Sequence, residues 1–103
     1  MTEMPREKLA VIGGGVAGVV SAHLLQKKFD VTLYESNDYV GGHTNTILIP
    51  DGPDAGTPVD TGFIVLNDRN YPLFNRFLDQ LSVPRRDSDM SFSFFDENSG
   101  FLY

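Results

Sequence analysis

Gly13, Gly15 and Gly18 follow a short apolar run and fit the pattern G-x-G-x-x-G. Gly13 allows a tight turn, Gly15 lacks the Cβ atom that would keep a pyrophosphate away from the backbone, and Gly18 lets a helix pack closely on a strand. The N–H groups that begin the helix, around Val16 and Ala17, have no partner within it, and together with the helix dipole they favour an anion. The pattern predicts a loop that binds a pyrophosphate.

A single carboxylate, Glu35, stands 22 positions after Gly13, at the end of a second apolar stretch. A carboxylate at that place can accept hydrogen bonds from both hydroxyls of an adenosine ribose. Its negative charge would repel a 2′-phosphate, which disfavours NADP. We assign the next residue, Ser36, to the same part of the site. The glycines and Glu35 together predict a site for the adenosine diphosphate half of a dinucleotide.

These residues need a strand, a helix and a second strand to position them. Residues 9–12 read as a buried strand, apolar residues from Val16 to Leu25 recur at helical spacing, and residues 31–34 are β-branched and aromatic. Such an order predicts a βαβ unit with two parallel strands and a right-handed crossover.

The remaining residues predict a hairpin, a helix and a final hairpin. We expect a strand at residues 44–49, a turn-rich loop at 50–56 and a second apolar stretch at 59–65. A helix is expected at residues 71–81, with Pro72 in its first turn. Residues 84–89 read as a solvated connector. Met90, Phe92 and Phe94 alternate with serines as in a half-buried strand, and a turn is expected at residues 96–100. The predicted fold class is α/β, with a Rossmann-like βαβ core.

A Gly-Gly pair, Gly41 and Gly42, follows Glu35 in the spacing E-x-x-x-x-x-G-G. With this pair, residues 10–44 resemble the FAD-binding segment of the flavin-containing amine oxidase and phytoene desaturase superfamily. The stretch VDTGFIVLN at residues 59–67, followed by Tyr-Pro at 71–72, is similar to predicted NAD/FAD-binding oxidoreductases of the same superfamily. Most members have arginine or another polar residue after the glycine pair, where this chain has His43.

The resemblance implies that FAD is the cofactor. The glycine loop and Glu35 would then bind the adenosine diphosphate half, and residues 61–63 would approach the ring system. The flavin-side half would be lined by Gly41, Gly42, His43 and Thr44. Two alternatives stay open on the residues alone: a fragment of an NAD-binding dehydrogenase, which the Gly-Gly pair disfavours, and a nucleotide-binding or assembly module without catalysis.

The bulk composition narrows the class of protein. The chain has 103 residues, a formal net charge of −6 and no cysteine, with 41% hydrophobic residues. The composition is that of a globular domain. The charge argues against nucleic acid or an anionic membrane as partner. No stretch approaches the length of a membrane helix. We expect a cytoplasmic protein.

No residue carries the signature of a catalytic group or a metal site. His23 and His43 lack the spacing of metal ligands, and no acidic cluster completes a site. We interpret His23 as a surface or packing residue and Arg85 as part of the connector. Nothing in the sequence shows Asp60 to be a base. We therefore assign no catalytic residue and no metal ligand.

Members of the superfamily are several times longer than this chain, and their substrate pocket lies towards the C-terminus. The resemblance implies a fragment, with residues 1–83 forming the dinucleotide-binding portion. Residues 84–103 would begin a truncated substrate-domain hairpin. We expect the chain alone to be inactive, and these residues do not identify its substrate. We also expect the chain either to self-associate or to lack a C-terminal portion that covers its last strands.

Overall fold

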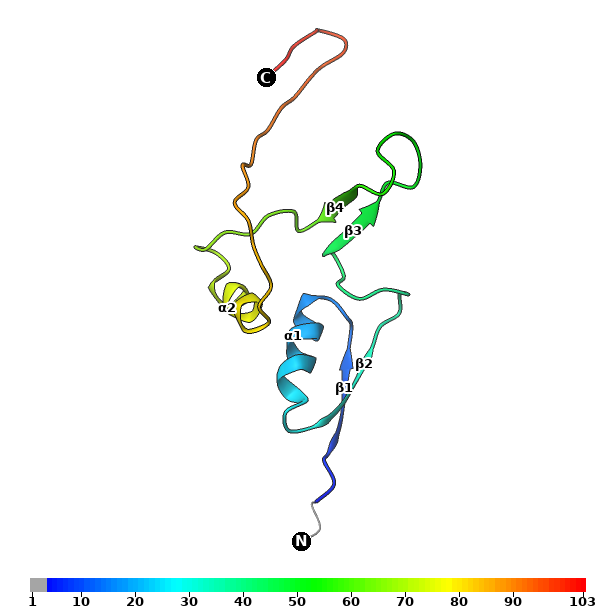
Figure 1. The fold of residues 1–103 in the computed structure, drawn as a ribbon, viewed down its shortest axis with the longest axis vertical. Helices are drawn as coiled ribbons and strands as arrows, with labels where there is room; N and C mark the ends of the chain where they lie inside the picture. Colours follow the sequence, from blue (N-terminus) through cyan, green and yellow to red (C-terminus); the bar gives the residue numbers. More distant parts are fainter. Residues whose placement is uncertain (1–3) are drawn as a thin grey trace. The chain divides into compact units, whose positions relative to one another are not determined.

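The computed structural model describes residues 4–103, which contain two helices and four strands (Figure 1). The elements, in chain order, are β1 (Lys8–Ile12), α1 (Val16–Leu25), β2 (Asp30–Tyr34), β3 (Asn45–Leu48), β4 (Pro58–Gly62) and α2 (Pro72–Gln80). Backbone contacts divide the chain into two compact units, the first ending at Ile64 and the second comprising Val65–Tyr103. Neither of these helices is long and apolar enough to cross a membrane.

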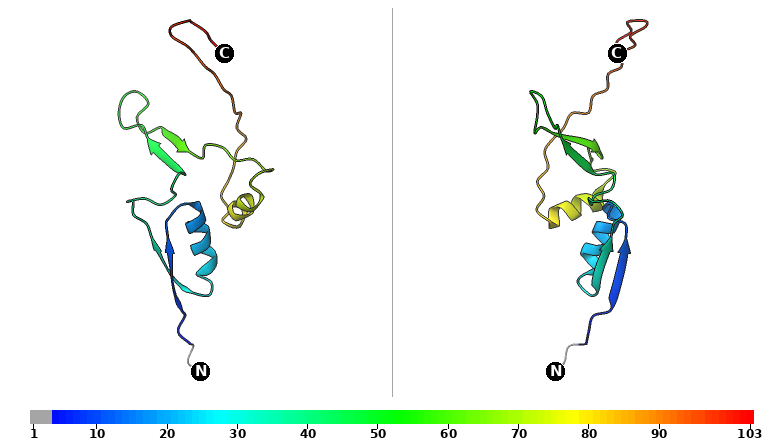
Figure 2. Two further views of the ribbon diagram at one scale, coloured as in Figure 1. Left: turned by 180° about the vertical axis from the view of Figure 1, so that it is seen from behind. Right: turned by 90° about the vertical axis from the view of Figure 1, so that its right-hand side faces the viewer.

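The first unit begins with the predicted βαβ arrangement. β1 and β2 form a parallel pair in which Lys8 lies opposite Asp30 and Ile12 lies opposite Tyr34. A parallel pair needs a crossover connection, and α1 supplies it while packing against both strands (Figures 1 and 2). The prediction of a βαβ unit, and with it the α/β class, is confirmed.

The two faces of the parallel pair differ in their exposure. The half-buried positions alternate with exposed ones, and they are Leu9 and Val11 in β1 and Val31 and Leu33 in β2. Val11 Cγ1 lies 3.6 Å from the place where a Cβ atom on Gly18 of α1 would stand, so this face is the one that α1 covers. On the opposite face Ile12 is 79% exposed and Tyr34 is 56% exposed. Parallel sheets are usually buried on both faces, and the first unit covers only one.

The predicted hairpin follows the βαβ unit. β3 and β4 pair antiparallel, with Asn45 opposite Gly62 and an irregularity in the register between Asn45 and Thr46. The Thr46 hydroxyl donates a hydrogen bond of 2.6 Å to Asp60 Oδ1 across the two strands. Asp60 therefore supports the hairpin through this cross-strand bond.

The hairpin ends earlier than its apolar sequence predicts. The stretch 59–65 is strand only as far as Gly62. Phe63 has φ 51, in the left-handed region, and this conformation cannot continue a strand. The loop between β3 and β4 turns at Gly52 (φ 84) and Gly56 (φ 85), as the glycine-rich sequence predicts.

In the second unit α2 lies within the predicted range and is closed by a defined cap. Pro72 occupies the first turn, where its missing N–H leaves no donor unpaired. At the other end the N–H of Ser82 donates to the Asp79 carbonyl (3.1 Å) and the N–H of Val83 donates to the Leu78 carbonyl (2.9 Å). With Ser82 at φ 55, this pair of bonds is a Schellman motif.

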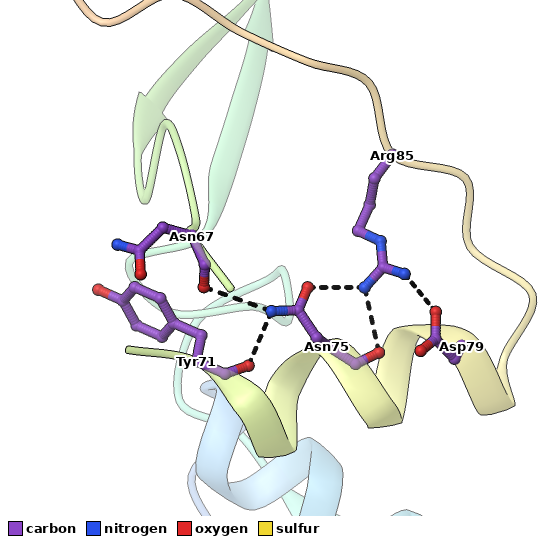
Figure 3. Close-up of polar contacts among 5 residues, drawn as sticks. All are labelled: Asn67, Tyr71, Asn75, Asp79 and Arg85. Carbon is purple, nitrogen blue, oxygen red and sulfur yellow. Dashed lines mark hydrogen bonds and ion pairs between the residues drawn. The ribbon is translucent and has the colours of Figure 1, made fainter. Parts of the chain in front are cut away.

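Side chains around Asn75 tie the chain on both sides of α2 to the helix (Figure 3). The Asn75 amide nitrogen donates to the carbonyls of Asn67 (3.3 Å) and Tyr71 (3.0 Å). Its Oδ1 accepts a hydrogen bond of 2.6 Å from Arg85, which also pairs with the Asp79 carboxylate. The Arg85 guanidinium, which belongs to the segment predicted as a solvated connector, is therefore held against α2.

The strand predicted at Met90 to Phe94 is wrong. The predicted turn at residues 96–100 is present, and one bridge, between Phe95 and Leu102, joins its two arms. Reciprocal backbone bonds of 3.1 and 2.9 Å link Phe94 and Tyr103. Alternating side chains indicate a strand only where a neighbouring chain takes up the hydrogen bonds, and no residue in the described range pairs with residues 90–93.

Candidate functional site

Consecutive glycines build the turn between β1 and α1. Gly13 has φ 99, a conformation that side chains rarely adopt, and its N–H donates to the Tyr34 carbonyl at 2.7 Å. Gly15 is the N-cap of α1, with no side-chain hydrogen bond at the cap and no acidic residue in the first turn. The leading N–H groups of the helix, which include Val16 and Ala17, have no acceptor within the helix, and the dipole adds positive potential there.

Gly15 and Gly18 are glycines for different reasons. A Cβ atom at Gly15 would have no neighbour within 4 Å, so packing within the chain does not require glycine there. A Cβ atom at Gly18 would stand 1.8 Å from the Gly13 carbonyl oxygen, which no side chain can tolerate. Gly18 is therefore needed for the fold, whereas the space beside Gly15 is open to a molecule from outside.

Glu35 follows β2 and reaches back to the glycine turn. The Gly14 N–H donates to Glu35 Oε2 at 2.7 Å, and the Asn37 N–H donates to Oε1 at 3.0 Å. The Ser36 hydroxyl makes a longer contact of 3.4 Å with Oε1. Ser36 is exposed, whereas Glu35 is half-buried. The carboxylate is thus fixed beside the turn by donors from both sides.

Hydrogen bonds to the charged form lower the pKa of the Glu35 carboxyl below its ordinary value. The N–H of Asn37 contributes most and the N–H of Gly14 next, while partial desolvation acts in the opposite direction. A lowered pKa means that these bonds stabilise the folded chain at neutral pH. Their contribution is lost as the pH falls through the lowered pKa, in the acid range.

Gly41 and Gly42 lie against the glycine turn. Gly41 forms a parallel bridge with Gly15, and its N–H donates to the Gly14 carbonyl at 2.7 Å. Both have positive φ, 119 and 62. A Cβ atom at Gly42 would stand 3.0 Å from Gly15 Cα. The pair is therefore glycine both for its backbone conformation and for its close approach to the loop.

The residues after the glycine pair lead into the hairpin. The Thr44 N–H donates to the Gly41 carbonyl at 3.0 Å and closes a turn. A Cβ atom at Gly62 would stand 2.1 Å from the His43 carbonyl oxygen, so β4 passes close to the backbone there. Both His43 and Thr44 are exposed. Their backbone lies between the glycine pair and β4, next to the segment from Thr61 to Phe63.

Gly14 is a residue of this site that sequence reasoning missed. It stands at a variable position of G-x-G-x-x-G, so the pattern gives it no task. In the structure its N–H bonds Glu35 and its carbonyl accepts from Gly41. The run of three consecutive glycines is the signal that could have pointed to it, because a third glycine exceeds what the pattern requires.

The structure therefore gathers three separate segments of the first unit, namely the glycine turn, the end of β2 and the glycine pair. They offer unpaired helix N–H groups, open space beside a backbone, and a fixed carboxylate. An ionised group of phosphate type suits the first two features, and a pair of hydroxyls suits the third. The residues present fit the adenosine diphosphate part of a dinucleotide.

Comparisons with known proteins bear on the same residues. A family model described as NAD(P)-binding Rossmann-like domain matches residues 11–81. The chain is 42% identical over 71 residues to a 4,4′-diaponeurosporene oxygenase from Staphylococcus haemolyticus, covering 66% of this chain and 14% of that protein. It is 35% identical over 91 residues to an L-glutamate oxidase precursor from Streptomyces diastatochromogenes, covering 82% of this chain and 14% of that protein.

A third relative carries the cofactor class in its name. The chain is 49% identical over 43 residues to a flavin-containing monooxygenase from Aspergillus flavus, covering 41% of this chain and 11% of that protein. The chain thus spans 14% or less of the length of these three relatives. The matching model spans more than half of the chain and the whole site described above. The chain belongs to the NAD(P)-binding Rossmann-like domain family, and it matches the N-terminal portion of the amine oxidase/FAD-binding superfamily.

Proposed function

We propose that this chain binds the adenosine diphosphate half of FAD as the nucleotide-binding part of an amine oxidase-type oxidoreductase. The observation that carries the proposal is the open space beside Gly15, where the chain itself gives no reason for glycine. A pyrophosphate at that place would meet the first N–H groups of α1. Gly13 and Gly18 hold the turn and the helix in position, and Glu35 accepts hydrogen bonds from the ribose hydroxyls.

FAD is preferred to NAD because of the glycine pair. Gly41 and Gly42 extend the glycine surface beyond the turn by lying directly on it. In this proposal the pair, with His43 and Thr44, lines the flavin-side half of the cofactor, and the segment from Thr61 to Phe63 follows. A relative named as flavin-containing supports the same choice. The flavin supplies the redox chemistry when bound, and the residues of this chain bind and orient it.

A charge reversal at Glu35 tests the ribose part of the proposal. We expect Glu35→Arg to weaken ADP binding about a hundredfold, because two hydrogen bonds to a charged acceptor are removed. ADP that carries a 2′-phosphate should bind the variant better than the wild type, since arginine pairs with phosphate. Calorimetric titration of both nucleotides measures the two changes. Glu35→Gln, which keeps the shape without the charge, serves as the matched control, with a smaller loss of ADP affinity and a smaller gain for the 2′-phosphate, since it relieves the repulsion without adding a positive partner.

We also propose that residues 1–83 form the dinucleotide-binding portion and that residues 84–103 begin a substrate-binding region. The aromatic side chains of the last segment remain largely exposed, with Phe92 at 76% and Tyr103 at 74%. In this proposal they and the open face of β1 and β2 are covered by a second copy or by further elements of the kind that longer proteins of the family contain.

The chain on its own is expected to self-associate, since a group of exposed apolar side chains tends to be covered by another chain. Light scattering over about a hundredfold range of concentration should show an average mass that rises with concentration. Phe92→Ser combined with Tyr103→Ser should shift the rise to higher concentration, and Asp87→Ser combined with Asp89→Ser should not. A monomer at every concentration would contradict the prediction.

A further inference from the structure

Gly14 has a position unlike that of the other glycines in the turn. It is the one buried residue in the range 4–103. Its N–H bonds Glu35 Oε2 at 2.7 Å, and its carbonyl accepts the Gly41 N–H at 2.7 Å. Gly14 therefore links the end of β2 to the glycine pair through both of its peptide groups.

The backbone at Gly14 does not itself require glycine. Its φ lies outside the left-handed region that Gly13 adopts, so alanine could take the same conformation. The side chains around it are what leave no room. A Cβ atom would stand 2.9 Å from Glu35 Oε2, 3.2 Å from Val40 Cγ1 and 3.4 Å from Glu35 Cβ. The tightest of these neighbours is the carboxylate oxygen, which is the end of a flexible side chain and can be displaced.

We propose that Gly14 is a positioning residue for the ribose subsite, acting through Glu35, and that it sets the selectivity for a ribose without a 2′-phosphate. The proposal rests on the proposed function, since it assigns Glu35 to the ribose. The Gly14 N–H directs one carboxylate oxygen of Glu35 towards the turn. Because Gly14 has no side chain, there is room for this oxygen beside it.

The hydrogen-bond capacity of the carboxylate is consistent with this role. A carboxylate has about four acceptor positions. The N–H groups of Gly14 and Asn37 take two of them at 2.7 and 3.0 Å, and Ser36 makes weaker contacts through its N–H and through its hydroxyl, the latter at 3.4 Å. The two positions that Ser36 holds only weakly remain for two ribose hydroxyls. A carboxylate that turned away from Gly14 would present neither in a fixed place.

Gly14→Ala is the decisive variant. We expect it to fold, because only the end of a flexible side chain must move, and to displace the carboxylate from its N–H donor. The ratio of affinities for ADP and for ADP with a 2′-phosphate should fall about tenfold, as the loss of one hydrogen bond to a charged group would give. A general weakening of the fold would lower both affinities and leave their ratio unchanged.

Two further measurements test the role of Gly14 independently of the proposed function. Carbon NMR of the Glu35 carboxyl should show its pKa rising towards the ordinary glutamate value in Gly14→Ala, since a donor to the charged form is lost. In a Glu35→Gln background, Gly14→Ala should change ADP affinity little, because the two residues act as one unit.

An unchanged pKa together with additive effects would overturn the role of Gly14. Failure of the wild-type chain to bind ADP would contradict the proposed function, and the assignment to a ribose subsite would fall with it. The pKa comparison would still decide whether Gly14 positions the carboxylate.

Discussion

Gly15→Val is expected to abolish binding of ADP and FAD while the βαβ unit stays folded. The backbone at Gly15 has φ −72 and ψ −178, an extended conformation that valine adopts without strain. Apart from Gly15 and its neighbours along the chain, no heavy atom of the described residues lies within 4 Å of the new Cβ, so the side chain enters open space. That space is where we place the pyrophosphate, and a branched side chain there would exclude it.

The expected loss of affinity is about a hundredfold or more, which corresponds to about 2.7 kcal/mol. Titration of wild type and variant with ADP measures it, and circular dichroism confirms that the variant is folded. Ser21→Val is the matched control. Ser21 is exposed within α1, so this substitution places the same side chain on the helix but away from the turn. Equal affinity of Gly15→Val and wild type would refute the placement of the pyrophosphate.

Gly18→Val should have the opposite consequence, loss of the fold. A Cβ atom there would stand 1.8 Å from the Gly13 carbonyl oxygen and 2.9 Å from the Gly13 carbonyl carbon. Both are backbone atoms of the turn, so α1 must move away from β1. The packing of α1 against β1 would be lost with it.

We expect this substitution to cost more than about 4 kcal/mol, which a unit of this size cannot withstand. Far-ultraviolet circular dichroism and thermal melting should show loss of helix and of a cooperative transition. Ser21→Val again serves as the control, because it introduces valine into the same helix. A native-like spectrum and melting temperature for Gly18→Val would contradict the close contact between α1 and β1.

The order of elements in the first unit could be predicted because each has a strong local signal. The apolar run before Gly13, the helical spacing after Val16 and the β-branched residues before Glu35 each favour one structure. Parallel pairing of β1 and β2 then follows from the crossover alone. These signals do not depend on the rest of the chain.

The link between Gly14, Glu35 and Gly41 could not be predicted, since it depends on register. Tyr34 lies opposite Ile12, and this pairing brings Glu35 to the turn. A motif gives the spacing along the chain but no distance between separate segments. For the same reason alternation alone misled at Met90 to Phe94, where no neighbouring strand takes up the backbone hydrogen bonds.

We place bound nucleotide at the glycine turn of the wild-type chain, and amide NMR during an ADP titration tests this placement. We expect saturable shifts at the turn from Gly13 to Gly18, at Glu35 and Ser36, and at Gly41 and Gly42. The amides of the second unit, Val65–Tyr103, should keep their positions. Absence of any saturable shift, or shifts confined to the second unit, would contradict it.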